Sequence, residues 1–237
     1  MIQTIFIILW TVFATAFFGT LTIIVACFNY KGDLTHGVTR LWAKSILFAS
    51  RIKVTIKGIS NLDPASSYIY MPNHQSLYDI PVLLAALPFQ FRWLAKVELF
   101  KIPIFGQAMR RAGYISIDRS NRKSAFQSLK KAAKIIRNGV SVLIFPEGTR
   151  SKDGNISSFK KGGFVLAIDS GVPIIPVIIH GTRDIMPTKQ MLIRPGNVIL
   201  EIKKPLETSA YTRKTKDDLM KKVRHIICES FEKQKNQ

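Results

Sequence analysis

Cysteine, histidine and acidic residues are scarce in this chain of 237 residues. Its two cysteines, Cys27 and Cys228, are too few for a disulfide framework or a cysteine-based metal cluster, and we interpret both as reduced side chains. The four histidines show no spacing typical of a zinc site. The sequence therefore predicts neither a bound metal nor a cofactor.

Acidic residues number 15 against 35 lysines and arginines, which gives a formal net charge of +20. A charge of this size predicts an anionic partner: a membrane surface, a phosphorylated substrate or a nucleic acid. The charge alone does not choose among these three. Hydrophobic residues make up 47% of the chain, which excludes a disordered protein and suffices for one main domain with an appendage.

Charged side chains are missing altogether from residues 1–30, where fifteen residues are Ile, Leu, Val or Phe. Because about 20 apolar residues span a bilayer, this run predicts a helix that enters a membrane. A cleaved signal peptide fits less well, since its basic start is absent and the apolar run is too long; a buried core helix is the other alternative. By the positive-inside rule, the basic residues that follow place the rest of the chain on the cytoplasmic side of the cell inner membrane. They are Lys31, Arg40, Lys44, Arg51 and Lys53.

A second, amphipathic helix is predicted over residues 35–50, where apolar side chains recur at helical spacing beside Arg40 and Lys44. Two interpretations stay open, because such a helix either lies at the membrane interface or packs on the globular part of the protein. We expect residues 1–53 to form N-terminal membrane-anchoring helices and residues 54–237 to form one α/β domain.

Short β-rich runs alternate with helical ones after residue 52, which is typical of an α/β fold, here predicted as a mixed sheet flanked by helices. One helix is predicted from Lys123 to Asn138, followed by Gly139 at its C-terminal cap, and another from about Lys216 to Lys233. The seven predicted strands are Val54–Lys57, Tyr68–Met71, Phe91–Leu94, Tyr114–Ile117, Ser141–Phe145, Ile174–Ile179 and Val198–Ile202.

The motif MPNHQSLYDIP, from Met71 to Pro81, contains a histidine and an aspartate that a catalytic pair requires. On a regular helix His74 and Asp79 would lie about 140° apart, so a turn must bring them together. Ser76 and Asp79 resemble a capping box that opens a helix after this turn. Asp79 could then hold one imidazole nitrogen and leave the other to act as a general base. The alternative is a surface histidine beside a helix-capping aspartate.

A serine nucleophile in a G-x-S-x-G elbow is absent from the chain. The nucleophile therefore belongs to the substrate, and we expect His74 to deprotonate a hydroxyl that attacks an acyl carbonyl without an acyl-enzyme intermediate. We expect the donors to the oxyanion among the backbone amides at the helix start after His74.

A second motif, FPEGTRSKDG, runs from Phe145 to Gly154 directly after a predicted strand. Its glycine allows close backbone approach, and Arg150 offers two parallel hydrogen bonds to a phosphate. Lys96 and Arg119 also follow strand-like runs, so these cations are expected to converge at one edge of the sheet. For each single cation the alternative is ordinary surface charge.

Four blocks in order resemble the glycerolipid acyltransferase family, and most closely its bacterial 1-acyl-sn-glycerol-3-phosphate acyltransferases. The blocks are NHQSLYD (73–79), GYISIDR (113–119), FPEGTRS (145–151) and VPIIPV (172–177). The resemblance implies that His74 is the general base and Asp79 its partner, and that Glu147 orients Arg150 or a glycerol hydroxyl. The residues that it implies for substrate binding are Lys96, Arg119, Glu147, Gly148, Thr149 and Arg150.

The resemblance also implies a reaction. A fatty acyl group passes from acyl-CoA or acyl carrier protein to the sn-2 hydroxyl of lysophosphatidic acid at the phospholipid bilayer, and phosphatidic acid forms for phospholipid biosynthesis. Glycerol 3-phosphate or another lysolipid is the alternative acceptor, and a hydrolase that passes the acyl group to water is a further alternative. A membrane-tethered binder of anionic lipid or nucleic acid would leave the four blocks unexplained, so we expect no nucleic acid partner.

Overall fold

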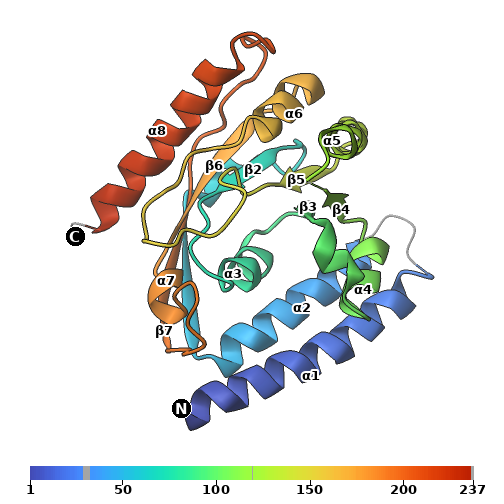
Figure 1. Ribbon diagram of the computed structural model, residues 1–237, viewed down its shortest axis with the longest axis vertical. Coiled ribbons are helices and arrows are strands. Elements are labelled where there is room, and N and C mark those ends of the chain that lie inside the picture. Colours follow the sequence, from blue (N-terminus) through green and yellow to red (C-terminus); the bar gives the residue numbers. More distant parts are fainter. Residues whose placement is uncertain (29–32, 119, 236–237) are drawn as a thin grey trace.

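A seven-stranded sheet forms the centre of the fold in a computed structural model, which describes residues 1–28, 33–118 and 120–235 (Figure 1). All seven strands that the sequence predicts are present, with boundaries shifted by no more than two residues. They are β1 (Ile52–Lys57), β2 (Ile69–Pro72), β3 (Phe91–Lys96), β4 (Ile115–Ile117), β5 (Ser141–Leu143), β6 (Ile174–His180) and β7 (Gly196–Ile202).

The strands are arranged in the order β1-β7-β6-β2-β5-β3-β4. Neighbouring strands are parallel throughout, except for the antiparallel pair of β6 and β7. The sheet is therefore mixed, as predicted, and β1 and β7 run against the other five strands. Because those five are parallel, the segments that follow β2, β3, β4, β5 and β6 all leave from the same edge, where the sequence places its candidate site residues.

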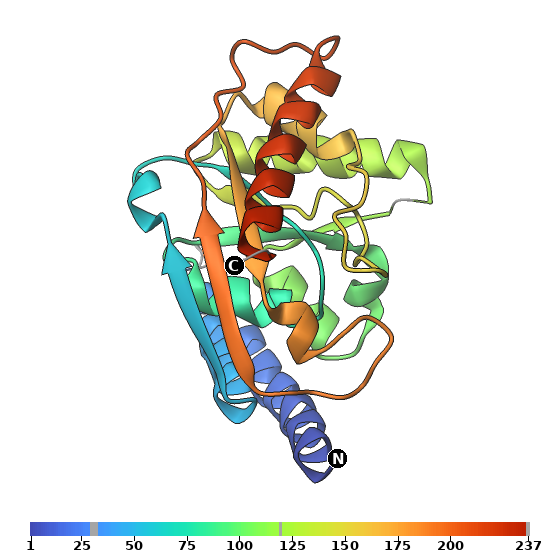
Figure 2. The same ribbon diagram turned by 90° about the vertical axis from the view of Figure 1, so that its left-hand side faces the viewer.

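Alternating side chains along the strands give the sheet two apolar faces. In β2, Tyr70 joins one buried cluster, whereas Ile69 and Met71 join the other. The first face is covered by α1 (Ile2–Val25), α2 (Asp33–Ala49) and α3 (Asp79–Ala86); the second is covered by α5 (Arg122–Arg137), α6 (Gly162–Ser170) and α8 (Lys216–Lys235) (Figures 1 and 2). Both predicted helices of the globular part, α5 and α8, are confirmed. The remaining elements are η1 (Ile59–Asn61), η2 (Val97–Lys101), α4 (Phe105–Arg111) and α7 (Thr182–Ile185).

The helix α1 is long and apolar enough to cross a membrane by length and composition, and most of its most apolar stretch is not buried. Side chains on its exposed surface include Phe6, Phe13 and Phe17. Ile7, by contrast, is fully buried in the first cluster, and Thr4 contacts the backbone of Ile193. The helix therefore has one side that packs on the protein and a broad apolar side that does not.

The second helix, α2, packs one of its faces on the globular part, which is one of the two interpretations that the sequence left open. Ala43, Ile46 and Leu47 lie in the same buried cluster as α3. Arg40 donates hydrogen bonds to the carbonyl oxygens of Pro88 and Ala85 at the end of α3, at 3.1 and 3.3 Å. The division into anchoring helices up to residue 53 and a domain from residue 54 stays a prediction.

The start of α4 allows a test of the packing between α4 and η2. An ideal Cβ atom at Gly106 would lie 2.2 Å from the carbonyl oxygen of Phe100, whereas at the exposed helical Gly37 it would meet nothing within 4 Å. We therefore expect Gly106→Ala to lower the free energy of unfolding by about 1 to 3 kcal/mol, the usual range for overpacking. Gly37→Ala should leave it unchanged or raise it by up to about 1 kcal/mol, because alanine favours helix. Denaturant unfolding of both variants in detergent measures the difference, and equal stabilities would contradict the close approach.

Candidate active site

Asn73 fixes the chain at the point where β2 ends. Its side-chain oxygen accepts a hydrogen bond from the backbone N–H of Ile179 at 2.7 Å, and its amide nitrogen donates to the carbonyl oxygen of the same residue at 3.0 Å. The side chain is fully buried. Asn73 therefore continues the pairing of β2 with β6 by one more pair of hydrogen bonds, although its own backbone has already left the sheet.

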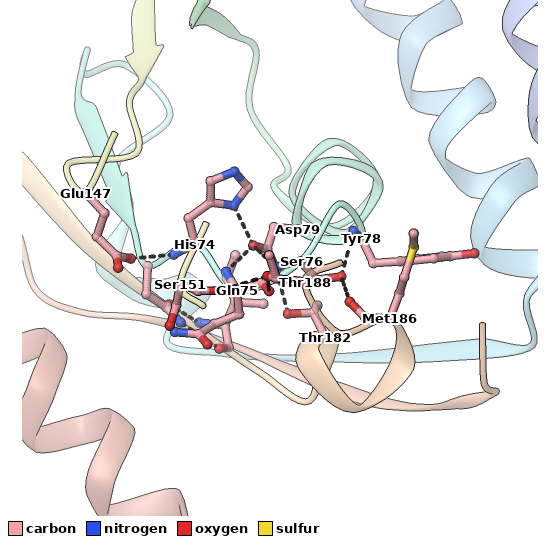
Figure 3. A network of polar contacts seen from close by, with 12 residues as sticks. His74, Gln75, Ser76, Tyr78, Asp79, Glu147, Ser151, Thr182, Met186 and Thr188 are labelled. Carbon is pink, nitrogen blue, oxygen red and sulfur yellow. Dashed lines mark hydrogen bonds and ion pairs between the residues drawn. The ribbon is translucent and has the colours of Figure 1, made fainter. Parts of the chain in front are cut away.

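His74 follows, and its backbone and ring are held by neighbours from the loop after β5. Its N–H donates to Glu147 Oε1 at 2.7 Å, and its carbonyl oxygen accepts from the N–H of Ser151 at 2.8 Å. The imidazole stacks on the ring of Phe145, with centroids 3.8 Å apart and planes 12° from parallel. The position of the ring is thus set before any contact to Asp79 is counted (Figure 3).

The predicted turn brings His74 and Asp79 together. His74 Nδ1 lies 2.7 Å from Asp79 Oδ2, and the carboxylate is fully buried while 14% of the histidine side chain is exposed. Gln75 N–H and Ser76 N–H donate to the same oxygen at 2.7 and 2.9 Å, and Thr182 Oγ1 donates to Oδ1 at 2.5 Å. Together with the Nδ1–H of His74 these groups give the carboxylate four hydrogen-bond donors. They replace the hydrogen bonds to water that the carboxylate loses on burial.

This pair has the geometry of a general base and its orienting carboxylate. An anionic acceptor beside Nδ1 favours the tautomer with its proton on Nδ1, which leaves Nε2 as a proton acceptor. No residue among those that the structure describes forms a hydrogen bond with Nε2, and Figure 3 shows this nitrogen pointing away from the network. The arrangement can therefore accept a proton from a hydroxyl placed above the ring.

The helix start differs in detail from the predicted capping box. Asp79 does accept from the N–H of Ser76, but Ser76 Oγ accepts from the N–H of Tyr78 and donates to the carbonyl oxygen of Met186. The expectation that amides at the helix start bind the oxyanion stays a prediction, but the amides of Gln75 and Ser76 are already bonded to Asp79. The first two amides after His74 thus stabilise the carboxylate and are not free for a substrate.

Glu147, which we expected to orient Arg150 or a glycerol hydroxyl, bonds to two backbone amides of the site. Its two carboxylate oxygens accept from the N–H groups of His74 and Ser157, at 2.7 and 2.8 Å, and only 1% of the residue is exposed. Burial raises the pKa of Glu147, and these two hydrogen bonds act in the opposite direction. The expected place of Glu147 among the substrate-binding residues stays a prediction.

The predicted phosphate-binding cations differ in what surrounds them. Lys96, at the end of β3, forms an ion pair of 3.0 Å with Glu98, and 60% of its side chain is exposed. Arg150 is half-buried, and the part of the chain with described placement provides no hydrogen-bond or ion-pair partner for its guanidinium. Arg119 lies outside the described residues. Gly148 adopts a positive φ of 77° in the turn before Arg150, and Thr149 is exposed.

Sequence reasoning missed Thr182 and assigned no role to Asn73. Thr182 stands 103 residues after Asp79 in the chain, and no spacing rule links them. The only available signal was the topology, since Thr182 opens α7 directly after β6, and β6 is a neighbour of β2. A prediction of the strand order would have placed both residues at the edge that carries His74.

Comparison of the sequence with known protein families identifies the family of the chain. The sequence profile of the acyltransferase family matches residues 53–180, which is more than half of the chain and includes His74, Asp79, Glu147 and Arg150. The chain therefore belongs to the acyltransferase family, as its four sequence blocks indicated.

Within this family the chain is similar to 1-acyl-sn-glycerol-3-phosphate acyltransferases. A chloroplastic enzyme of Arabidopsis thaliana is 38% identical over 86% of this chain and 56% of its own, and the alpha enzyme of Homo sapiens is 29% identical over 91% and 76%. The crystal structure of the 1-acyl-sn-glycerophosphate (LPA) acyltransferase PlsC from Thermotoga maritima superposes with a TM-score of 0.85 at 28% identity, covering 100% of this chain and 96% of that one. The chain spans little more than half the length of two relatives, 56% of the protein of Arabidopsis thaliana and 58% of that of Brassica napus.

Thr182 provides a test of the network around Asp79. Thr182→Val keeps the shape of the side chain but leaves Asp79 Oδ1 buried without its donor, which should lower the free energy of unfolding by about 1 to 3 kcal/mol. We expect the kcat of acyl transfer to fall about tenfold with KM nearly unchanged, because the carboxylate orients His74 and does not contact the acceptor. Thr182→Ser, which retains the hydroxyl, should restore most of both. A kcat equal to that of the unmodified protein would show that Thr182 does not position the pair.

Proposed function

We propose that this protein transfers a fatty acyl group from an acyl thioester to the sn-2 hydroxyl of 1-acyl-sn-glycerol 3-phosphate and thereby forms phosphatidic acid. The observation that carries the proposal is the pair of His74 and Asp79, joined at 2.7 Å, with Nε2 of His74 left as an acceptor. The names of the similar proteins state this activity, and the match to the structure from Thermotoga maritima covers nearly the whole of both chains.

The reaction proceeds in one chemical step on this proposal. His74 Nε2 takes the proton of the sn-2 hydroxyl as its oxygen attacks the thioester carbonyl, and Asp79 stabilises the imidazolium that forms. The new carbon–oxygen bond forms as the carbon–sulfur bond breaks, and the proton on His74 passes to the departing thiolate. No metal or cofactor is needed, and the donor is acyl-CoA or acyl carrier protein.

The acceptor's phosphate group selects the acceptor on this proposal. Arg150 is half-buried and free of carboxylate partners among the described residues, so its guanidinium can form two parallel hydrogen bonds with a phosphate. Lys96 must first break its ion pair with Glu98 before it can bind the phosphate as strongly as Arg150 does. Arg119 belongs to the same proposed set by its place after β4.

The membrane is where both lipids reside, and α1 supports an attachment to it. The large apolar side chains that α1 exposes in the isolated chain would be buried if this side of the helix entered a bilayer. By the positive-inside rule we propose the cytoplasmic side of the cell inner membrane for the catalytic part.

Replacement of the base tests the chemistry. We expect His74→Ala to lower kcat by about 100 to 10,000-fold, the usual contribution of a general base, and to lower the free energy of unfolding by about 1 to 3 kcal/mol, because Asp79 loses one of its donors. The assay offers purified protein a single acyl thioester with lysophosphatidic acid, glycerol 3-phosphate and neutral lysolipids, and identifies the products by mass. Acylation of glycerol 3-phosphate or of a neutral lysolipid alone would move the acceptor assignment, and full activity of the variant would rule out His74 as the base.

Replacement of Arg150 tests the phosphate assignment. Because a charge-assisted hydrogen bond contributes about 1.5 to 3 kcal/mol, Arg150→Ala should raise KM for lysophosphatidic acid at least about tenfold. Lys96→Ala is the matched control, since its cation is exposed and paired with Glu98, and we expect a much smaller rise in KM. A larger effect at Lys96 than at Arg150 would shift the phosphate site towards the end of β3.

A further inference from the structure

The helix α5 is basic along its whole length. No aspartate or glutamate occurs between residue 119 and residue 146, a stretch that contains the helix and its flanking turns. The helix has 16 residues, so it is about 24 Å long. Five exposed cations are distributed along it, and they are Lys123, Lys130, Lys131, Lys134 and Arg137.

The cations of α5 are not neutralised by carboxylates of the described residues. Arg137 donates to the backbone carbonyl of Asp169, whose carboxylate is already paired with Arg213 at 2.7 Å. Lys130 lies over the ring of Phe126, 4.8 Å from its centroid, and 42% of Phe126 is exposed. The surface therefore combines unpaired positive charge with one aromatic anchor.

The helix α8, on the same face of the sheet, shows that this pattern is not a general property of the protein. α8 also carries six lysines and arginines, but it contains Asp217, Asp218, Glu229 and Glu232 as well. Two of its carboxylates form ion pairs with lysines, Glu229 with Lys233 at 2.6 Å and Asp217 with Lys161 at 3.1 Å. A solvated basic helix of this chain thus has acidic neighbours, and α5 differs from it.

The position of α5 separates it from the apolar side of α1. The buried parts of α5 pack on one face of the sheet, whereas α1 and α2 pack on the other. Figures 1 and 2 both place α5 in the upper half of the molecule and α1 and α2 at the bottom. If α1 attaches to a bilayer, the basic surface of α5 points away from that bilayer and into the aqueous phase.

The N-terminal end of α5 lies close in sequence to the reactive edge. The helix begins five residues after the end of β4, whose carboxyl end shares its edge of the sheet with those of β2 and β5. His74 and Arg150 follow these two strands. A macromolecule bound along α5 would therefore be adjacent to the edge at which the thioester has to be presented.

We propose that α5 is the docking surface for an acidic soluble protein that carries the acyl group as a thioester. This inference rests on the proposed acyl transfer and specifies the partner that delivers the donor. Complementary charge along 16 residues suits an extended acidic surface such as a helix of the partner, with Phe126 as the apolar contact. The nucleotide of a free acyl-CoA is too compact to contact cations along the whole helix.

The experiment compares two double variants of the full-length protein with equal changes in charge. K130E/K131E reverses two neighbouring exposed lysines on α5, and K221E/K222E does the same on α8, where the lysines are also exposed and lie on the same face of the sheet. Kinetics are measured with acyl carrier protein and with acyl-CoA bearing the same acyl chain. Titration with the acidic carrier protein alone gives its Kd, and sedimentation with anionic vesicles gives the membrane affinity.

We expect K130E/K131E to raise KM for the carrier-bound donor, and Kd for the carrier itself, by about tenfold at low ionic strength, with a smaller effect at high salt. KM for acyl-CoA and vesicle binding should change less than about twofold, and K221E/K222E should behave as the unmodified protein does. An equal rise in KM for acyl-CoA, a matching loss of vesicle binding, or equal effects of the two variants would each overturn the proposal. If the unmodified protein transfers no acyl group from any donor, the proposed function fails, and the carrier titration still decides the docking surface on its own.

Discussion

The buried carboxylate of Asp79 is the group on which the site depends most. A charged group without water must be compensated by hydrogen bonds, and each donor that is removed costs more than it contributed when formed. The donors to Asp79 come from the turn after β2 and from α7 after β6, so this one charge ties two neighbouring strand ends together. The conformation of the turn is therefore a condition for burying the charge and not an independent choice of the chain.

As a result, the backbone of His74, one face of its ring and its Nδ1 are all held by neighbouring groups, and Nε2 is left for a substrate. Its backbone N–H and carbonyl oxygen are bonded to the loop after β5, its ring lies on Phe145, and its Nδ1 faces Asp79. A base that is held in this way loses little orientational entropy when a substrate arrives. The same loop carries Arg150, so the residues that fix the backbone of His74 and the proposed phosphate-binding group belong to a single segment.

Features that depend on a short stretch of sequence could be predicted, whereas contacts between distant segments of the chain could not. Alternation and β-propensity were sufficient for the seven strands, and His74 with Asp79 needed only one turn. The strand order was beyond reach because β7 returns antiparallel between β1 and β6. Thr182 bonds to Asp79 and Ser157 bonds to Glu147 because the tertiary fold brings these residues together, and no local sequence pattern predicts these contacts. At Lys96 a nearby residue matters, since the carboxylate of Glu98, two residues away, forms an ion pair with the lysine and would compete with a phosphate for it.

The clamp between Asn73 and Ile179 has a consequence for motion. A loop after a strand usually opens more readily than the sheet, because its backbone hydrogen bonds face solvent. Here the side chain of Asn73 makes the two bonds that a further sheet residue would make, to the last residue but one of β6. Local fraying of the turn that carries His74 therefore requires the loss of these two buried hydrogen bonds to β6, which couples the turn to the core. Its amide protons should exchange with solvent on the slow timescale of the central strands, and the reactive geometry should persist until the whole sheet unfolds.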